Sequence, residues 1–275
     1  MKKLMLLIAI SMFIVAGFIS CNNQAVKEGQ EPQVEVNAGG TIAKIKQTNT
    51  LRVGTSGEQF PFSFTNDAGK LEGLDIKIAN AMAKRMGVEV EFVQMKFEKL
   101  IPALNNGDID VIFSGMSNTL KRNMDVAYTQ PYFKTGKAIL SKDKAIGSAN
   151  TEAINKESVR VAVFGKSTSE DFVKKNYPNA TIISVSNYDE IDKLLLNNEI
   201  DAFVGDMEIC EIISFTHHLS TNFYLSPLDG DIEYIAAAVS ADDALFFNLV
   251  ENYIRIVNDH NIGIVVENLW LEYIN

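Results

Sequence analysis

The chain has 275 residues, of which 47% are hydrophobic, and its formal net charge at pH 7 is −10. Nucleic-acid-binding proteins carry clustered positive charge, so this acidic balance argues against a nucleic-acid partner and against charge-driven adhesion to anionic lipid. Cysteine and histidine are too few and too scattered for a typical metal site, and we expect neither a metal nor a cofactor; they are Cys21, Cys210, His217, His218 and His260.

The N-terminus has the pattern of a bacterial signal peptide at residues 1–20. Two lysines precede an uncharged apolar run at residues 4–19, which is shorter than the roughly 18–20 residues that span a bilayer comfortably. The motif at residues 18–21 resembles a lipobox, and this resemblance implies that Cys21 becomes a diacylated N-terminal residue. An uncleaved membrane anchor, or an ordinary signal peptide with an incidental cysteine, remains the alternative.

Residues 21–47 are polar and bury little apolar surface, so we expect a flexible tether there. A lipid on Cys21 would leave Cys210 as the remaining thiol, with no partner for an intramolecular disulfide. The fold would then depend on its core, for which the hydrophobic content is sufficient.

The segment after the tether predicts a doubly wound α/β unit. Apolar residues recur at helical spacing from Asp75, which we expect to cap the helix, to Gly87, which we expect to end it. The near-continuous apolar run at residues 109–113 is typical of a strand buried on both faces of a parallel sheet. The predicted order is strand, helix, strand, helix, strand, at residues 51–54, 75–87, 88–92, 97–104 and 109–113.

The same order recurs in the second half of the chain, at residues 158–164, 170–177, 181–185, 191–195 and 200–205. One stretch aligns with the first half without a gap, at an offset of 91 residues, and places Ile109 on Ile200 and Asp110 on Asp201. Gly115 and Asp206 then both lie just beyond a buried strand, where open α/β sheets bind ligands. This repeat predicts two related lobes that share one site.

Several motifs occur in an order and spacing that are specific together: residues 61–64, 73–76, 100–104, 114–122 and 131–132. Through them, the chain from Leu51 to about Leu271 resembles the polar amino-acid-binding branch of the bacterial extracellular solute-binding proteins, family 3. The resemblance implies a monomer that captures a free amino acid and delivers it to an ABC importer permease. It also implies export, with the predicted lipid anchor holding the protein at the membrane.

The resemblance implies the periplasmic-binding-protein type II fold, two doubly wound α/β lobes joined by a two-strand hinge. The crossing strands are expected near Thr135–Leu140 and Leu228–Ala237. Lobe 1 would comprise residues 48–134 and 230–275, and lobe 2 residues 135–229.

An amino acid at neutral pH is a zwitterion, so its site needs a cation for the carboxylate and an anion for the ammonium. Arg122 offers a planar fork suited to a carboxylate, and the resemblance assigns it that role. The resemblance assigns the α-ammonium to Asp206. The alternatives are a solvated helix charge for Arg122 and a helix N-cap for Asp206.

The resemblance adds further residues to the expected site. Gly115, Ser117 and Thr119 would help to bind the carboxylate, and Phe97 would pack on the ligand or belong to the core. Ser167 and Thr168 would contact the ligand from lobe 2. The first loop would contribute Ser56, Gln59 and Phe60.

Lys166 replaces a glycine that is usual in the family, which leaves the direction of its side chain open. Ser56 replaces an acid found in relatives that bind basic amino acids, and a ligand with a neutral side chain is therefore expected, although Glu58 keeps a basic one open. No catalysis is expected. The alternatives are a cyclohexadienyl-dehydratase-like enzyme, with Glu58, Lys166 or Glu170 as general acid, and a sensory amino-acid-binding protein.

Overall fold

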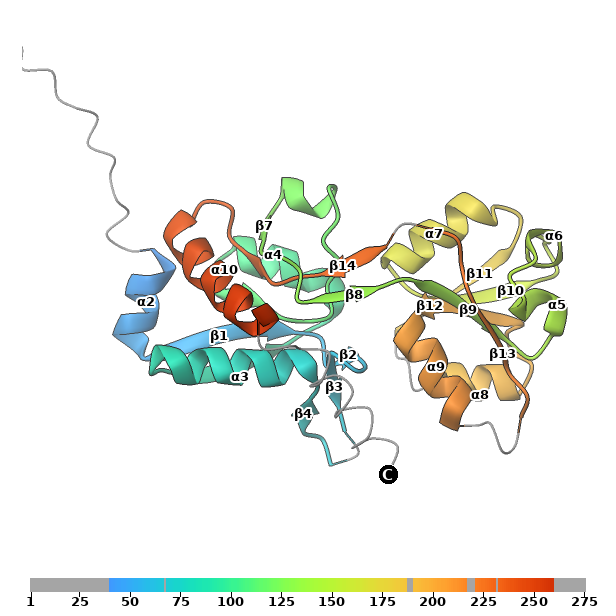
Figure 1. Ribbon diagram of the computed structural model, residues 1–275, viewed down its shortest axis with the longest axis horizontal. Helices are drawn as coiled ribbons and strands as arrows, with labels where there is room; N and C mark the ends of the chain where they lie inside the picture. The colour runs from blue at the N-terminus through green and yellow to red at the C-terminus, as the bar shows by residue number, and fades with distance from the viewer. Residues whose placement is uncertain (1–39, 67, 187–189, 217–220, 231, 260–275) are drawn as a thin grey trace, which may run out of the picture. The chain divides into compact units, whose positions relative to one another are not determined.

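The computed structural model describes residues 40–66, 68–186, 190–216, 221–230 and 232–259 (Figure 1). The predicted signal peptide, Cys21 and the three histidines lie outside these residues. Within the described ranges, no helix is both long enough and apolar enough to cross a bilayer.

Lobe 1 is built on a five-stranded sheet of order β5-β1-β6-β15-β7. Its strands are β1 (Thr50–Thr55), β5 (Glu89–Gln94), β6 (Val111–Ile112), β7 (Ala127–Tyr128) and β15 (Ala238–Val239). β1 pairs in parallel with β5 and β6, and β15 adds antiparallel pairs to β6 and β7. All five residues of the predicted strand 109–113 are buried, so the apolar run marks the core although regular pairing is shorter.

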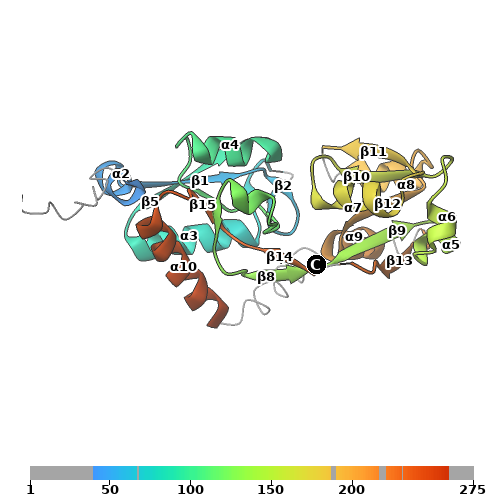
Figure 2. The same ribbon diagram turned by 90° about the horizontal axis from the view of Figure 1, so that it is seen from above.

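Helices cover both faces of this sheet (Figures 1 and 2). They are α2 (Thr41–Thr48), α3 (Leu74–Met86), α4 (Leu100–Asn105), α10 (Ala244–Asp259) and the 3₁₀ turns η1 (Phe97–Lys99) and η2 (Arg122–Met124). A smaller three-stranded sheet joins β2 (Glu58–Gln59), β3 (Ser63–Thr65) and β4 (Leu71–Glu72). Phe246 and Val250 of α10 lie in the same buried cluster as Leu51 and Val53 of β1, so the late segment completes the core of the early one.

Lobe 2 repeats the architecture with a sheet of order β11-β10-β12-β9-β13. Its strands are β9 (Lys137–Ser141), β10 (Arg160–Phe164), β11 (Thr181–Val185), β12 (Ala202–Asp206) and β13 (Tyr224–Pro227). Its helices are α5 (Lys144–Gly147), α6 (Thr151–Ile154), α7 (Thr168–Asn176), α8 (Ile191–Leu196) and α9 (Met207–Thr216). β10 pairs in parallel with β11 and β12, and β9 is antiparallel to β12.

Two antiparallel strands connect the sheets, β8 (Phe133–Thr135) and β14 (Glu233–Ile235), with Thr135 opposite Glu233 (Figure 2). β8 runs directly into β9 of lobe 2, and β14 runs directly into β15 of lobe 1. Because a pair of short strands carries both connections, a few backbone dihedrals at its ends are sufficient for a hinge.

An arginine–aspartate clamp occurs at the same place in both lobes. Arg52 on β1 donates Nη2 to Asp110 Oδ1 at 2.5 Å and its backbone N–H to Asp110 Oδ2 at 2.8 Å. Arg160 on β10 donates the same two groups to Asp201, at 2.9 and 2.8 Å. The gapless alignment paired Asp110 with Asp201, so the internal repeat has a structural counterpart.

Two features differ from the sequence-based expectations. The last residues of the expected tether form α2, whose Ile45 is buried and whose Thr41 N–H donates to Asp243 Oδ2 at 2.8 Å. Residues 41–47 of the expected tether therefore belong to a helix that packs on lobe 1 and are not part of a flexible linker. Asp75 does not cap α3, because Gly73 occupies the N-cap position and Asp75 is fully buried in the first turn. Gly87 ends α3 in the left-handed conformation, as predicted.

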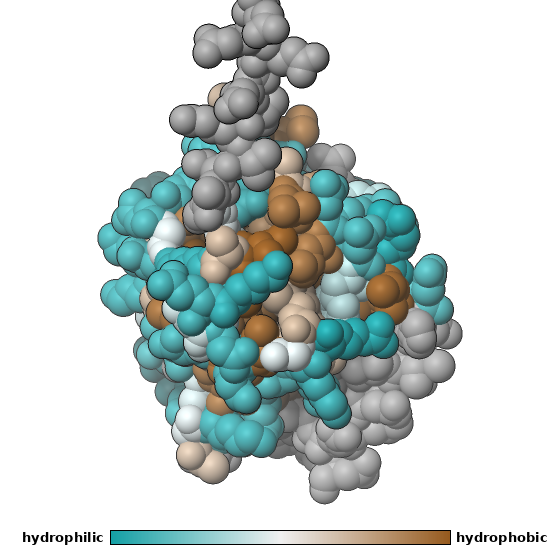
Figure 3. Space-filling model, turned by 90° about the vertical axis from the view of Figure 1, so that its left-hand side faces the viewer, coloured by the Kyte–Doolittle hydropathy of each residue, from teal (hydrophilic) through white to brown (hydrophobic). Residues whose placement is uncertain are grey.

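The end of lobe 1 that carries α2 and α10 presents a mainly hydrophilic surface with one band of hydrophobic residues (Figure 3). Ile42 of α2 and Phe247 and Leu249 of α10 are only partly buried against the core beneath them, and Leu245 is exposed. None of these four residues lines the pocket described next.

Candidate functional site

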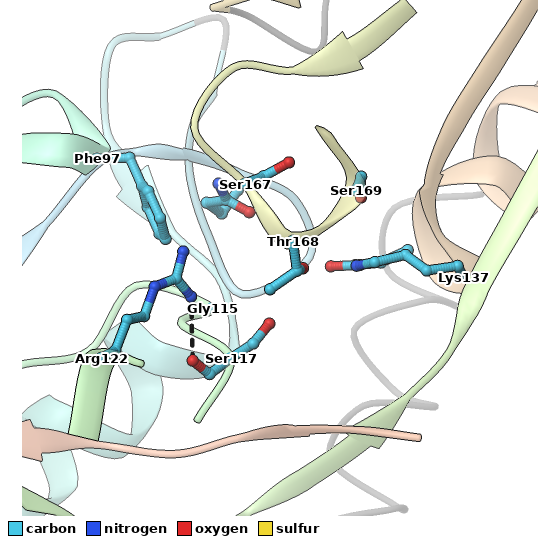
Figure 4. A pocket seen from close by; sticks show the side chains of 10 residues that line it. Phe97, Gly115, Ser117, Arg122, Lys137, Ser167, Thr168 and Ser169 are labelled. Atoms are coloured by element: carbon cyan, nitrogen blue, oxygen red, sulfur yellow. Dashed lines mark hydrogen bonds and ion pairs between the residues drawn. The ribbon is translucent and has the colours of Figure 1, made fainter. Parts of the chain in front are cut away.

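Side chains from both lobes line one pocket next to the hinge strands (Figure 4). Its cavity volume is about 10 Å³, which is room for about one water molecule. Eight residues expected from the sequence line it, together with Lys137 and Ser169; the eight are Gln59, Phe97, Gly115, Ser117, Arg122, Ser167, Thr168 and Asp206.

Arg122 begins η2 and lies against the wall of lobe 1. Its Nη1 donates to the carbonyl oxygen of Ser117 at 3.0 Å, and its guanidinium carbon lies 5.3 Å from the centroid of the Phe97 ring (Figure 4). Thr119 does not line the pocket; its Oγ1 accepts from the backbone N–H of Arg122 at 3.2 Å and so fixes the start of the turn. The guanidinium is held by a carbonyl group and an aromatic face, with its fork at the pocket.

The Gly115 loop is supported by two of the sequence motifs together. Leu74 and Asp75 donate their N–H groups to the carbonyls of Pro61 and Phe62, at 3.0 and 2.8 Å. The Asp75 carboxylate then accepts from the N–H of Gly115 at 2.5 Å. Burial raises the pKa of Asp75 to about 6, although this hydrogen bond opposes the rise.

Gly115 has a φ of +58° and faces Phe62, to whose ring a Cβ on Gly115 would approach within 3.0 Å. A side chain at this position would therefore strain the backbone and press on the ring. The motifs at residues 61–64 and 73–76 form the scaffold that presents the glycine at the pocket.

Asp206 is the last residue of β12 and enters the pocket from lobe 2. Its Oδ1 accepts from Nζ of Lys137 at 2.5 Å, and the same Nζ donates to Glu233 Oε1 at 2.9 Å. Glu233 Oε2 also accepts from the hydroxyls of Ser117 at 2.6 Å and Thr168 at 2.9 Å. A continuous polar network therefore joins both lobes and the hinge strand β14.

Ser167 has a structural role as well as a place in the pocket wall. Its Oγ accepts from the N–H of Glu170 at 3.3 Å, which makes it the N-cap of α7, and donates to the carbonyl of Phe164 at 2.6 Å. Thr168 begins the helix, and its hydroxyl lies in the pocket network.

Lys166 points away from the pocket. Its φ of +59° departs from the usual helical or extended values, and its ammonium, on a side chain 70% exposed, lies 3.6 Å from Glu98 Oε1. Its N–H donates to Glu170 Oε2 at 2.6 Å. This geometry answers the question that the sequence left open, and it makes Lys166 part of the rim.

In the first loop, only Gln59 lines the pocket. Phe60 packs on Phe64, with ring centroids 4.7 Å apart. Ser56 is buried behind the wall, where its Oγ accepts from Ser114 Oγ at 3.1 Å. Phe60 and Ser56 support the loop rather than line the cavity.

Lys137 and Ser169 line the pocket but were not expected from the sequence, and neither was Glu233, which pairs with Lys137 from outside the lining. Lys137 is the one charged residue in the segment 135–141, and it is buried. A lone cation in an apolar strand is a signal that was available, because such a residue is rarely buried unless it is paired. Its partner was not readable, because three acids lie within the predicted second crossing at residues 228–237.

Glu208 makes a testable contribution to pH dependence beside the hinge. Its Oε2 accepts from Thr135 Oγ1 at 2.6 Å, and burial raises its pKa to about 7. A carboxyl whose pKa is raised on folding stabilises the fold below its unfolded pKa of about 4.3, and this contribution is lost as pH rises to about 7. Glu208→Gln is therefore expected to raise the melting temperature at pH 8, with a much smaller effect at pH 4.5. Thermal melts of both proteins at the two pH values check this, and an equal shift at both would contradict it.

Comparisons with known proteins place the chain in a family. The sequence model of the bacterial extracellular solute-binding proteins, family 3, matches residues 51–195. The chain belongs to this family. It is 32% identical over 218 residues to the glutamine-binding protein of an ABC transporter from Bacillus subtilis, covering 76% of each chain. It is 31% identical over 198 residues to a probable histidine-binding protein from Campylobacter jejuni, covering 71% of this chain and 74% of the relative.

Solved structures of this family have the same fold. An ancestral amino-acid-binding protein, described as a precursor of cyclohexadienyl dehydratase, aligns with a TM-score of 0.73 at 31% identity and covers 86% of this chain and 99% of its own. A mutant of the arginine-binding protein of T. maritima aligns with a TM-score of 0.73 at 28% identity, covering 84% and 99%. The type II periplasmic amino-acid-binding fold expected from the sequence is therefore confirmed.

Proposed function

We propose that this protein captures a free amino acid as a zwitterion and delivers it to an ABC importer. The observation that carries the proposal is that Arg122 of lobe 1 and Asp206 of lobe 2 line one pocket. Arg122 binds the ligand carboxylate through its planar fork, with Gly115 and Ser117 beside it, and Asp206 accepts from the ammonium. The relatives from Bacillus subtilis and Campylobacter jejuni, one glutamine-binding and one probably histidine-binding, support this class of ligand.

Capture proceeds by hinge closure of lobe 1 (residues 48–134 and 230–275) over lobe 2 (residues 135–229). A cavity with room for about one water molecule does not admit an amino acid, so the lobes separate for entry. β8 and β14 carry both connections and are the natural hinge. The ligand selects the closed state because only that state satisfies both of its charges.

The protein acts outside the cytoplasm as a lipid-anchored monomer. The basic start, the apolar run at residues 4–19 and the motif ending at Cys21 support a cleaved and lipidated N-terminus. Mass spectrometry of the mature protein from the membrane fraction tests this: a diacylated Cys21 at the N-terminus supports the anchor, and a chain that retains residues 1–20 refutes it.

The site binds its ligand and does not convert it. Three residues were candidate general acids for a dehydratase: Glu58, Lys166 and Glu170. The residues that line the pocket do not include them. The Lys174 ammonium holds the pKa of Glu170 below its ordinary value, so Glu170 is a poor proton donor at neutral pH.

A thermal-shift screen of the purified protein against the twenty amino acids tests the function. One or a few amino acids are expected to stabilise the wild type, and the stabilisation should disappear in Asp206→Ala and Arg122→Ala. Lys121→Ala is the matched control, because it removes an exposed charge next to Arg122 and should leave the shift intact. A folded wild type that responds to no amino acid would overturn the proposal.

A further inference from the structure

An ion pair beside the pocket is not required for recognition of a zwitterion: Lys137 lines the cavity, and Glu233 contacts Lys137, Ser117 and Thr168 of its wall. Lys137 begins β9, directly after the hinge strand β8, and Glu233 begins the other hinge strand, β14. The side chains are 4% and 15% exposed, and Nζ of Lys137 lies 2.9 Å from Oε1 of Glu233. Such a pair next to the cavity contributes to the electrostatic field in which a ligand side chain would be bound.

Both partners are ionised. Burial alone would raise the pKa of Glu233, but the Lys137 ammonium and the hydroxyls of Ser117 and Thr168 outweigh burial and hold that pKa below its ordinary value. Burial would likewise lower the pKa of Lys137, and the carboxylates of Asp206 and Glu233 raise it instead. At neutral pH the network therefore holds one ammonium between two carboxylates.

The charges of the described site balance. Arg122 and Asp206 are matched by the carboxylate and the ammonium of the zwitterion, as in the proposed function, on which the present inference rests. Lys137 and Glu233 then neutralise each other, so an uncharged ligand side chain leaves the closed site without net charge. A charged side chain brings one buried charge that these four groups do not compensate, and such a charge is costly.

We infer that Glu233 is a specificity-determining residue: it occupies Lys137 from the hinge strand and thereby restricts the site to amino acids with uncharged side chains. Its two oxygens are suited to this task. Oε1 accepts from the ammonium, while Oε2 accepts from Ser117 of lobe 1 and Thr168 of lobe 2. A ligand carboxylate that approached Lys137 would have to displace a carboxylate that is already held by three donors.

Glu233→Gln tests this, because glutamine keeps one oxygen for the two hydroxyls but replaces the oxygen that accepts from Lys137 with an uncharged NH2 group. Titration calorimetry with L-glutamine and L-glutamate compares ligands that differ in side-chain charge but little in shape. The wild type is expected to prefer glutamine. In E233Q, the ratio of the two Kd values should move toward glutamate by about tenfold or more, since Lys137 then loses one of its two carboxylate partners and keeps only Asp206, which the ligand ammonium also engages.

Lys137→Met provides a test of opposite sign. It leaves Asp206 and Glu233 without their shared cation, so affinity for L-lysine should rise relative to L-glutamine. The double variant K137M/E233Q removes one charge of each sign and should return to a preference for uncharged side chains without gaining glutamate affinity. Circular dichroism and thermal melts establish that each variant is folded. If one of the single variants does not fold, the double variant still allows the test, because it removes one charge of each sign and so keeps the net charge of the site.

The outcomes are distinguishable. Equal weakening of both ligands in E233Q, or a wild type that prefers glutamate, would overturn the specificity role and leave the pair as a link between the lobes. A folded wild type that binds none of the twenty amino acids would instead refute the proposed function itself.

Discussion

Arg122→Ala is expected to weaken amino-acid binding about 100-fold or more while it lowers the stability of the ligand-free protein only slightly. In the described structure the guanidinium contacts the carbonyl of Ser117 and the face of Phe97, and such contacts are individually modest, about 1 kcal/mol each. The ligand carboxylate, by contrast, would lose its charged, two-pronged donor in a site closed to water, and truncating one partner of such a pair typically costs about 2–5 kcal/mol. Titration calorimetry and thermal melts of the ligand-free variant measure the two effects separately.

Arg122→Lys separates charge from geometry at the same position. Lysine keeps the positive charge but offers one compact ammonium in place of the planar fork, so an intermediate loss of about tenfold is expected. If Arg122→Ala bound the ligand as tightly as the wild type, Arg122 would be a solvated surface charge and the zwitterion assignment would fail. If it were also strongly destabilised without ligand, the arginine would be part of the framework.

The sequence was most informative where the chain repeats a local pattern. Helical and strand periodicities located the five predicted elements of each repeat to within a few residues, and the alignment of Asp110 with Asp201 corresponds to two clamps of the same geometry. The place of Asp206 in the site was predicted from the end of a buried strand and the family resemblance, and that of Arg122 from the family motif; both residues line the pocket. These features depend on residues that are close in sequence, or on the strand order of a doubly wound sheet, which determines where the ends of the buried strands lie.

The Lys137–Glu233 pair was not predictable in the same way. It depends on the register of two short strands that meet from distant parts of the chain, with Thr135 opposite Glu233 and Lys137 two residues further along. Alternate residues of a strand share a face, so this register brings the two charges together, and a slip of one residue would separate them. Segments of three residues carry too little hydrophobic pattern to specify a register.

Asp75 shows a related limit. Its place just inside α3 suggested a cap, because short acidic side chains are frequent at helix starts. The structure uses its carboxylate for a distant partner, the N–H of Gly115 at 2.5 Å. The backbone around Gly73 allows this contact, because the first N–H groups of the helix are hydrogen-bonded to the carbonyls of Pro61 and Phe62 and so hold Asp75 next to the Gly115 loop.

Gly73→Ala is therefore expected to lower the free energy of unfolding by about 3 kcal/mol or more, the largest loss of stability among the variants proposed. Gly73 has a φ of +121°, which L side chains rarely adopt. A Cβ on Gly73 would meet the carbonyl of Phe62, whose oxygen and carbon would lie only 2.3 and 2.6 Å away. Both are backbone atoms, and the oxygen also accepts from the N–H of Asp75. Moving the Phe62 carbonyl away from the new methyl group would therefore break the contact between the two motifs and release the Gly115 loop.

Gly69→Ala is the matched control, because it separates conformational strain from the clash. Gly69 also has a positive φ, +75°, but a Cβ there would meet no atom within 4 Å. Only the cost of a left-handed residue remains, about 1–2 kcal/mol. Urea unfolding of both variants and the wild type gives the difference directly. Equal losses would mean that the Phe62 backbone yields to the new methyl group; a larger loss at Gly73, accompanied by weaker ligand binding, would show that the close approach of these two segments holds the binding loop in place.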